Sequence, residues 1–140
     1  DITLIVHNNQ IFALTTCQFT ATTFKQVKTK TSPQGNIEDA LNPCLIALIS
    51  GASFVARAYA LDESLSDLIK EAIKHRGFSF IDVLQPCLSF GFPYDWYKQR
   101  IIKVKNKKLS NLQEAIKLAS NPFAIGLFYK VKKQVFEDHF

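Results

Sequence analysis

The chain has 140 residues, 47% of them hydrophobic and 21% charged, which suits one folded domain and excludes intrinsic disorder. Its longest apolar runs, residues 44–49 and 123–129, are too short to cross a bilayer, so we expect a cytoplasmic protein with no membrane partner. The net charge of +5 is unevenly distributed, and one basic stretch either favours an anionic partner or is ordinary solvated surface; its members are Lys98, Arg100, Lys103, Lys105, Lys107 and Lys108.

The first predicted element is a strand over residues 2–6, which we expect to be buried on both faces because it is short, apolar and rich in branched side chains. The sequence holds no methionine and begins inside this strand. We therefore expect the chain to be the C-terminal part of a longer polypeptide, with one unpaired edge in its sheet.

Helices and strands alternate after a long polar loop over residues 15–42. Asn42 and Pro43 favour the start of a helix, and Ser64 with Asp67 is typical of a capping box before a second helix that ends near Gly77. This alternation predicts an α/β fold with a parallel sheet flanked by helices and joined by right-handed crossovers. The expected strands cover 53–59, 78–84 and 123–129, and the expected helices 43–50, 64–76 and 110–121.

Polar residues follow the predicted strand ends near His7, Ala58 and Gln85. In a parallel sheet these ends share the edge where ligands bind. Asn8 and Asn9 allow two interpretations: a side-chain oxygen and a nearby carbonyl suit a Mg²⁺ ion that shares its shell with a phosphate, or the pair is a turn whose side chains bond their own backbone.

Several strings in order along nearly the whole chain carry a family resemblance. They are HNNQIFALTTCQFTATT, KTKTSPQGNIEDALNP, GASFVARAYA, LIKEAIKHRGFSFIDVLQPC, WYKQR and AIGLFY. The chain resembles the C-terminal part of the thiamine-diphosphate-binding β subunit of 2-oxoacid:ferredoxin oxidoreductases. The resemblance implies a thiamine-diphosphate-binding fold, truncated at the N-terminus, in which residues 1–140 are part of one domain with a C-terminal extension over about 88–140.

The resemblance also implies an activity: oxidative decarboxylation of a 2-oxoacid, with transfer of the acyl group to coenzyme A and of electrons to ferredoxin. The implied cofactors are thiamine diphosphate, Mg²⁺ and a [4Fe–4S] cluster. The implied partners are an α or fused γ–α subunit and ferredoxin.

The resemblance assigns roles to individual residues. Asn9 would offer its side-chain oxygen and Ile11 its carbonyl to Mg²⁺, while the third protein ligand would be the Asp of a Gly-Asp-Gly segment that these 140 residues lack. Leu14, Thr15 and Thr16 would bind the cofactor beside them. The catalytic carboxylate cannot be identified in this sequence.

The three cysteines include no C-x-x-C pair, which argues against a disulfide framework or a self-contained metal site. By resemblance, Cys87 would be the distant cysteine ligand of the [4Fe–4S] cluster, which needs three further thiolates. We expect Cys44 to pack in the core and Cys17 to be a structural thiol.

The chain departs from the family pattern at Phe12, Ala13 and Cys17, where Tyr, Gly and Gly are usual. A β-carbon at a glycine position with positive φ costs about 1 kcal/mol. Competing interpretations are another thiamine-diphosphate enzyme of the acetolactate-synthase type, a structural subunit that has lost the site, and a nucleic-acid-binding module built on the basic stretch near Trp96 and Tyr97.

Overall fold

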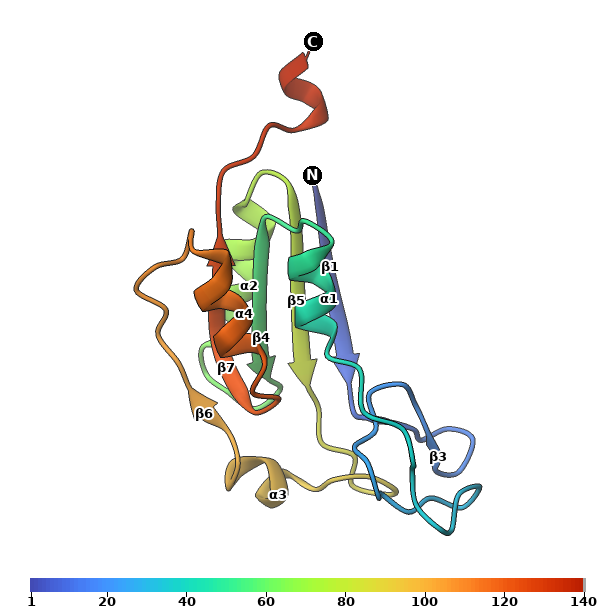
Figure 1. The fold of residues 1–140 in the computed structure, drawn as a ribbon. Coiled ribbons are helices and arrows are strands. Elements are labelled where there is room, and N and C mark those ends of the chain that lie inside the picture. The colour runs from blue at the N-terminus through green and yellow to red at the C-terminus, as the bar shows by residue number, and fades with distance from the viewer. Residues whose placement is uncertain (140) are drawn as a thin grey trace.

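The computed structural model describes residues 1–139. Its main sheet has the strand order β1-β5-β4-β7-β6, and a second sheet pairs β2 with β3 (Figure 1). The strands are β1 (Ile2–Asn8), β2 (Ile11–Phe12), β3 (Gln18–Phe19), β4 (Phe54–Tyr59), β5 (Phe78–Leu84), β6 (Ile102–Lys103) and β7 (Ala124–Lys130).

Helices cover both faces of the main sheet. The helical segments are α1 (Pro43–Ile49), α2 (Leu65–Lys74), α3 (Tyr94–Lys98), α4 (Leu112–Ala119) and the 3₁₀ turn η1 (Phe136–His139). Figure 1 shows α1 and α4 on one face and α2 on the other, while α3 lies below the strand ends. The predicted α/β architecture with flanking helices is confirmed.

The sheet is parallel on one side and mixed on the other. β1, β5 and β4 are parallel, as predicted, but β7 runs antiparallel to β4. After β5 the chain stays at the carboxyl edge of the sheet, where it forms α3 (Figure 1). It enters β6 from this edge, so β6 runs opposite to β5, and β7 is parallel to β6. The prediction of a purely parallel sheet is therefore wrong for these last strands.

β1 is an edge strand, and the prediction that it is buried on both faces is wrong. Ile2 is 64% exposed and Leu4 45% exposed. The apolar clusters on the two faces of the sheet, one under α1 and α4 and the other under α2, reach Val6 and Ile5 but not the start of the strand. Within residues 1–139 the only neighbour of β1 in the main sheet is β5, so the outer side of β1 is one unpaired edge of the sheet, and β6 forms the other.

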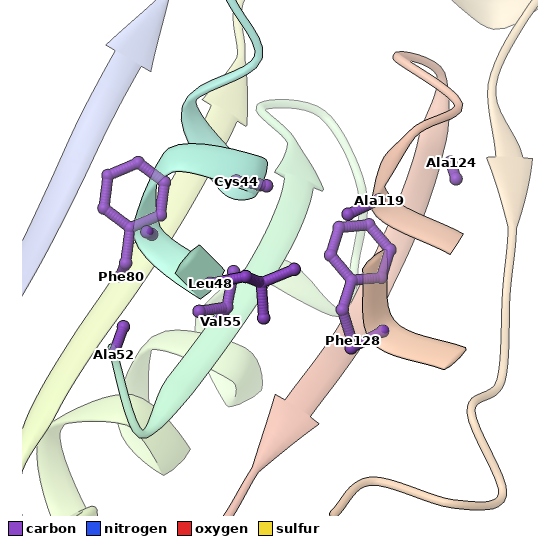
Figure 2. Close-up of a cluster of buried hydrophobic side chains, with 10 residues drawn as sticks. Cys44, Leu48, Ala52, Val55, Phe80, Ala119, Ala124 and Phe128 are labelled. Carbon is purple, nitrogen blue, oxygen red and sulfur yellow. The ribbon is translucent and has the colours of Figure 1, made fainter. Parts of the chain in front are cut away.

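One core packs α1 and α4 against β4, β5 and β7 (Figure 2). Cys44 lies in this core with no exposed surface, and burial raises the pKa of its thiol to about 12, so its predicted packing role is confirmed. Asn42 accepts a hydrogen bond from the Leu45 N–H at 3.3 Å, which confirms it as the cap of α1.

The start of α2 differs from the predicted capping box. The Ser64 side chain caps no N–H of the helix and instead donates to Asp62. A loop carboxylate just upstream thus competes successfully for the serine hydroxyl. Gly77 follows the helix with φ +122°, a conformation that favours glycine, as expected near a helix end.

Candidate functional site at the carboxyl edge of the sheet

The carboxyl ends of β1, β5 and β4 lie at one edge, as predicted. His7 pairs in register with Val83, and Val83 pairs with Ala58. The His7 Nδ1 atom lies 3.1 Å from Gln85 Oε1, so the two strand ends also meet through their side chains. His7 is exposed and contacts the end of β5.

The segment Asn8–Ile11, here called the Asn turn, connects the last residue of β1 to the first residue of β2. The Asn9 Oδ1 atom accepts a hydrogen bond from the Ile11 N–H at 3.2 Å, and Gln10 adopts φ 62° between them. The turn interpretation is therefore confirmed. The Asn9 amide oxygen and the Ile11 carbonyl are neutral oxygens, a donor type that suits Mg²⁺, so the chemistry of these two groups is compatible with the ion.

The two buried neighbours of Asn9 hold the turn in place. The Asn8 Nδ2 group donates to Asp82 Oδ1 at 3.1 Å. The Asn8 Oδ1 atom accepts from the Gln10 N–H at 3.2 Å and from Thr22 Oγ1 at 2.8 Å. On the other side of Asn9, the Tyr97 hydroxyl donates to Gln10 Oε1 at 3.2 Å.

Asp82 belongs to an ion pair that the sequence interpretation missed. The Arg57 Nε group donates to Asp82 Oδ2 at 2.8 Å, and the two side chains are 2% and 1% exposed. Arg57 also donates to Asn42 Oδ1 and to the Asn121 carbonyl, each at 2.8 Å. One basic and one acidic residue inside otherwise apolar strands were the available signal, because buried charges are normally paired.

A cavity of about 370 Å³ opens beside this network. Its walls come from the ends of β1 and β5, from β4, from the loop before α1 and from the α4–β7 connection, so polar side chains of several segments converge there. Among the lining residues are Asn8, Gln10, Thr22, Asn42, Arg57 and Asp82.

The segment Leu14–Cys17, here called the open loop, lies beyond β2. Leu14 is 98% exposed, and Thr15 and Thr16 are exposed too. Thr15 donates to Gln18 Oε1 at 2.7 Å, while the Thr16 N–H donates to the Ala13 carbonyl in a tight turn. The structure therefore presents these hydroxyls to the outside of the carboxyl edge.

The departures at Ala13 and Cys17 have different consequences. Cys17 adopts φ 74°, so a residue with a β-carbon stands where glycine would be unstrained. Ala13 has no positive φ. Phe12 is 58% exposed. Only one of the two glycine replacements thus strains the backbone.

Cys87 follows β5 and is partly exposed. A Cβ on Gly91 would lie 2.9 Å from Cys87 Cβ and 3.0 Å from Ile11 Cδ1, so the cysteine packs close to the Asn turn. Cys17 is partly exposed and lies 3.4 Å from the Phe90 carbonyl in the same segment. Residues 1–139 contain no group of three or more His, Cys, Asp or Glu arranged to hold a metal ion.

The lysine and arginine side chains of the basic stretch Lys98–Lys108 are all exposed. Two of its members already have partners: Lys103 forms an ion pair with Asp62 at 2.6 Å, and Arg100 lies 4.4 Å from the centre of the Trp96 ring. Lys105, Lys107 and Lys108 line a shallow depression of about 300 Å³ with Glu114. Across the described residues, the helices are too short or too polar to cross a membrane.

Comparison with known proteins shows the family to which the chain belongs. Residues 1–83 match the family model described as "Thiamine pyrophosphate enzyme, C-terminal TPP binding domain". The chain belongs to this thiamine pyrophosphate enzyme family. Residues 87–140 match a second model, which describes the C-terminal region of the beta subunit of pyruvate ferredoxin oxidoreductase. The Asn turn, the open loop, β1 and β4 fall in the first match, as does β5 except for its last residue, Leu84.

The similar curated proteins include β subunits of 2-oxoacid:ferredoxin oxidoreductases. The chain is 39% identical to a 2-oxoacid:ferredoxin oxidoreductase subunit beta of Sulfolobus sp over 93% of its length and 48% of the relative's. It is 34% identical to a 2-oxoglutarate synthase subunit KorB of Archaeoglobus fulgidus, over 99% of this chain and 50% of that one. The resemblance to the C-terminal part of these β subunits is confirmed.

A solved structure shows the same fold. It is a 2-oxoglutarate:ferredoxin oxidoreductase from Magnetococcus marinus with 2-oxoglutarate, coenzyme A and succinyl-CoA bound. The match has a TM-score of 0.92 at 29% identity and covers 98% of this chain and 50% of that one. This chain therefore spans about half the length of the relatives it matches.

Proposed function

We propose that this chain is the C-terminal part of the β subunit of a 2-oxoacid:ferredoxin oxidoreductase. The enzyme would decarboxylate a 2-oxoacid oxidatively, pass the acyl group to coenzyme A and send the electrons to ferredoxin. The observation that carries the proposal is the similarity to such β subunits over 93% of the chain, with both family matches in the expected order.

The Asn turn supports a Mg²⁺–thiamine diphosphate site. The Asn9 side-chain oxygen and the Ile11 carbonyl would bind the ion, and Leu14, Thr15 and Thr16 would face the cofactor from the open loop. When bound, thiamine diphosphate would supply stabilisation of the carbanion that decarboxylation of the 2-oxoacid generates. This chain holds the ion's ligands in place.

Cys87 is the candidate iron–sulfur ligand. Its partial exposure and its packing close to the Asn turn suit a route for electrons leaving the cofactor. Three further thiolates would complete a [4Fe–4S] cluster. Because Cys44 is buried in the α1–α4 core on another part of the sheet, it is not among them.

The remaining assignments follow from the same proposal. Residues 1–140 would be part of one thiamine-diphosphate-binding domain, with residues from about 88 onward as its C-terminal extension. The structure joins both parts in one sheet, since β7 pairs with β4. An α or γ–α subunit and ferredoxin would be the protein partners, in the cytoplasm.

Assay of the full-length β subunit, produced with its α subunit, tests the proposal. We expect CoA-dependent reduction of ferredoxin or viologen dye with at least one of pyruvate, 2-oxoglutarate and branched 2-oxoacids. Cofactor binding without any dye reduction, together with acetolactate formation, would instead identify a carboligase. Failure to bind thiamine diphosphate at all would identify a structural subunit.

A further inference from the structure

The side chains of Arg57 and Asp82 form a buried ion pair on two central strands of the sheet. Replacing a buried ion pair by apolar residues of the same volume is often neutral or stabilising, so stability is weak grounds for its presence. Both residues sit on central strands, with β5 next to β1, and the second Asp82 oxygen bonds the Asn8 side chain at 3.1 Å.

Asn8 connects the ion pair to the rest of the Asn turn through its side-chain hydrogen bonds. Its side-chain oxygen takes hydrogen bonds from Gln10 N–H and from Thr22, so the amide cannot rotate without breaking bonds to both turn and loop. Of the two polar groups of the Asn8 amide, only the NH₂ group can donate to the Asp82 carboxylate, and this fixes the Asn8 oxygen toward Gln10 and Thr22. Asn9 is the next residue, and its own oxygen faces the Ile11 backbone.

Arg57 in turn fixes Asp82. Its guanidinium reaches the Asn42 side chain and the Asn121 carbonyl on the side away from the carboxylate, so the pair is tied to α1 and to the α4–β7 connection. The network runs from the start of α1 and the α4–β7 connection across β4 and β5 to the turn, along one face of the sheet, and its charged members are almost fully buried.

We propose that the buried Arg57–Asp82 pair positions the Asn turn through Asn8 and thereby sets the affinity of the site for Mg²⁺. The inference rests on the proposed function, since it takes Asn9 and Ile11 as the metal's ligands. Groups of this kind that orient metal ligands typically contribute about 10-fold to 100-fold in metal affinity.

Titration of Mg²⁺ into the full-length complex, stripped of metal and saturated with thiamine diphosphate, tests the inference by calorimetry at a temperature where all variants are folded. Asp82→Asn is expected to weaken Mg²⁺ binding by about 10-fold or more. Thr22→Val, which removes one donor to Asn8 from a surface loop, is expected to weaken it by a smaller factor.

Ile81→Ala is the matched control. Ile81 is the fully buried neighbour of Asp82 on β5 and packs in the opposite core, so its truncation lowers stability without touching Asn8. We expect its thermal stability to fall while its Mg²⁺ affinity stays that of wild type. A purely structural role of Asp82 would make the two variants behave alike, which would overturn the inference.

The outcomes separate the inference from the proposed function. If wild type binds Mg²⁺ and Asn9→Ala does not, the metal site is real, and wild-type affinity in both Asp82→Asn and Thr22→Val overturns only the positioning role. If Asp82→Asn fails to fold, unchanged affinity in Thr22→Val alone overturns it. If wild type binds no Mg²⁺ with the cofactor, both proposals fail together.

Discussion

The Asn turn and the open loop are neighbours in sequence but differ in how the protein holds them. In the turn, the side chains of Asn8 and Gln10 are 6% and 4% exposed. Asn8 forms hydrogen bonds with Asp82 of β5 and with Thr22, and Gln10 accepts one from Tyr97 of α3. In the open loop, Leu14 is almost fully exposed and Thr15 bonds only to nearby residues of the same stretch. Buried side-chain hydrogen bonds therefore hold the Asn turn to distant parts of the fold, whereas the exposed Thr15 side chain of the open loop bonds only locally.

Both segments contain positive φ angles: Gln10 at 62° in the turn, and Thr16 at 64° and Cys17 at 74° in the loop. In the turn the strained conformation is balanced by buried hydrogen bonds. In the loop the Cys17 thiol makes only a weak contact with the Phe90 carbonyl at 3.4 Å, and the Cys17 carbonyl accepts a hydrogen bond from the exposed Lys30 N–H at 3.1 Å. The same backbone conformation is thus tolerated for different reasons at the two places.

The largest expected effect comes from Cys87, which packs beside the turn but lies outside its hydrogen bonds. In the full-length complex, Cys87→Ser should lose cluster iron and ferredoxin reduction, because a hydroxyl cannot replace the thiolate, and should keep thiamine diphosphate binding. Iron analysis and calorimetry measure the two separately. Cys17→Ser is the control, and wild-type iron content in the Cys87 variant would remove the ligand assignment.

The turn and the loop should also differ in cofactor binding. Asn9→Ala should weaken Mg²⁺-dependent binding of thiamine diphosphate by more than about 100-fold, since removing a direct ligand costs more than removing a group that orients one. Thr16→Ala in the open loop should cost a smaller factor, because a single hydroxyl bond to phosphate is lost. Calorimetry on the full-length complex compares them, and equal losses would contradict the proposed division between turn and loop.

Glycine at Gln10 and at Cys17 should have opposite effects on stability. Cys17→Gly should raise the free energy of unfolding by up to about 1 kcal/mol by relieving the left-handed backbone. Gln10→Gly should lower it by about 1 kcal/mol, because the buried Tyr97 hydroxyl then loses its acceptor. Urea unfolding of the full-length subunit measures both, and a stabilising Gln10→Gly would show that the turn is not held as described.

The smallest expected effect concerns the basic stretch, far along the chain from the turn and loop. Reversing Lys105, Lys107 and Lys108 to Glu should slow reduction of an acidic ferredoxin several-fold at low salt, with cofactor binding unchanged. Near 1 M salt, where the Debye length is about 3 Å, the difference should vanish. Lys74→Glu on α2 is the control. A salt profile identical to wild type would mean that the stretch is ordinary solvated surface.

Much of the molecule could be predicted from local sequence. Periodicity and turn residues placed β4, β5, α1, α2 and α4 within a few residues, because such signals depend on neighbours along the chain. The adjacent asparagines after a strand pointed to the carboxyl edge for the same reason. Cys44 could be assigned to the core from its place on an apolar helix.

Tertiary structure decided what depends on distant segments. Nothing near β1 in sequence says that it lies at an edge with Ile2 exposed, and nothing near β7 says that it runs antiparallel to β4. Arg57 and Asp82 are 25 residues apart, and only strand register brings their charges within 2.8 Å and gives Asn8 its partner. The direction of strand pairing and the buried polar contacts depend on which strands become neighbours. That order depends on how all the strands and helices pack together, so local sequence does not determine it.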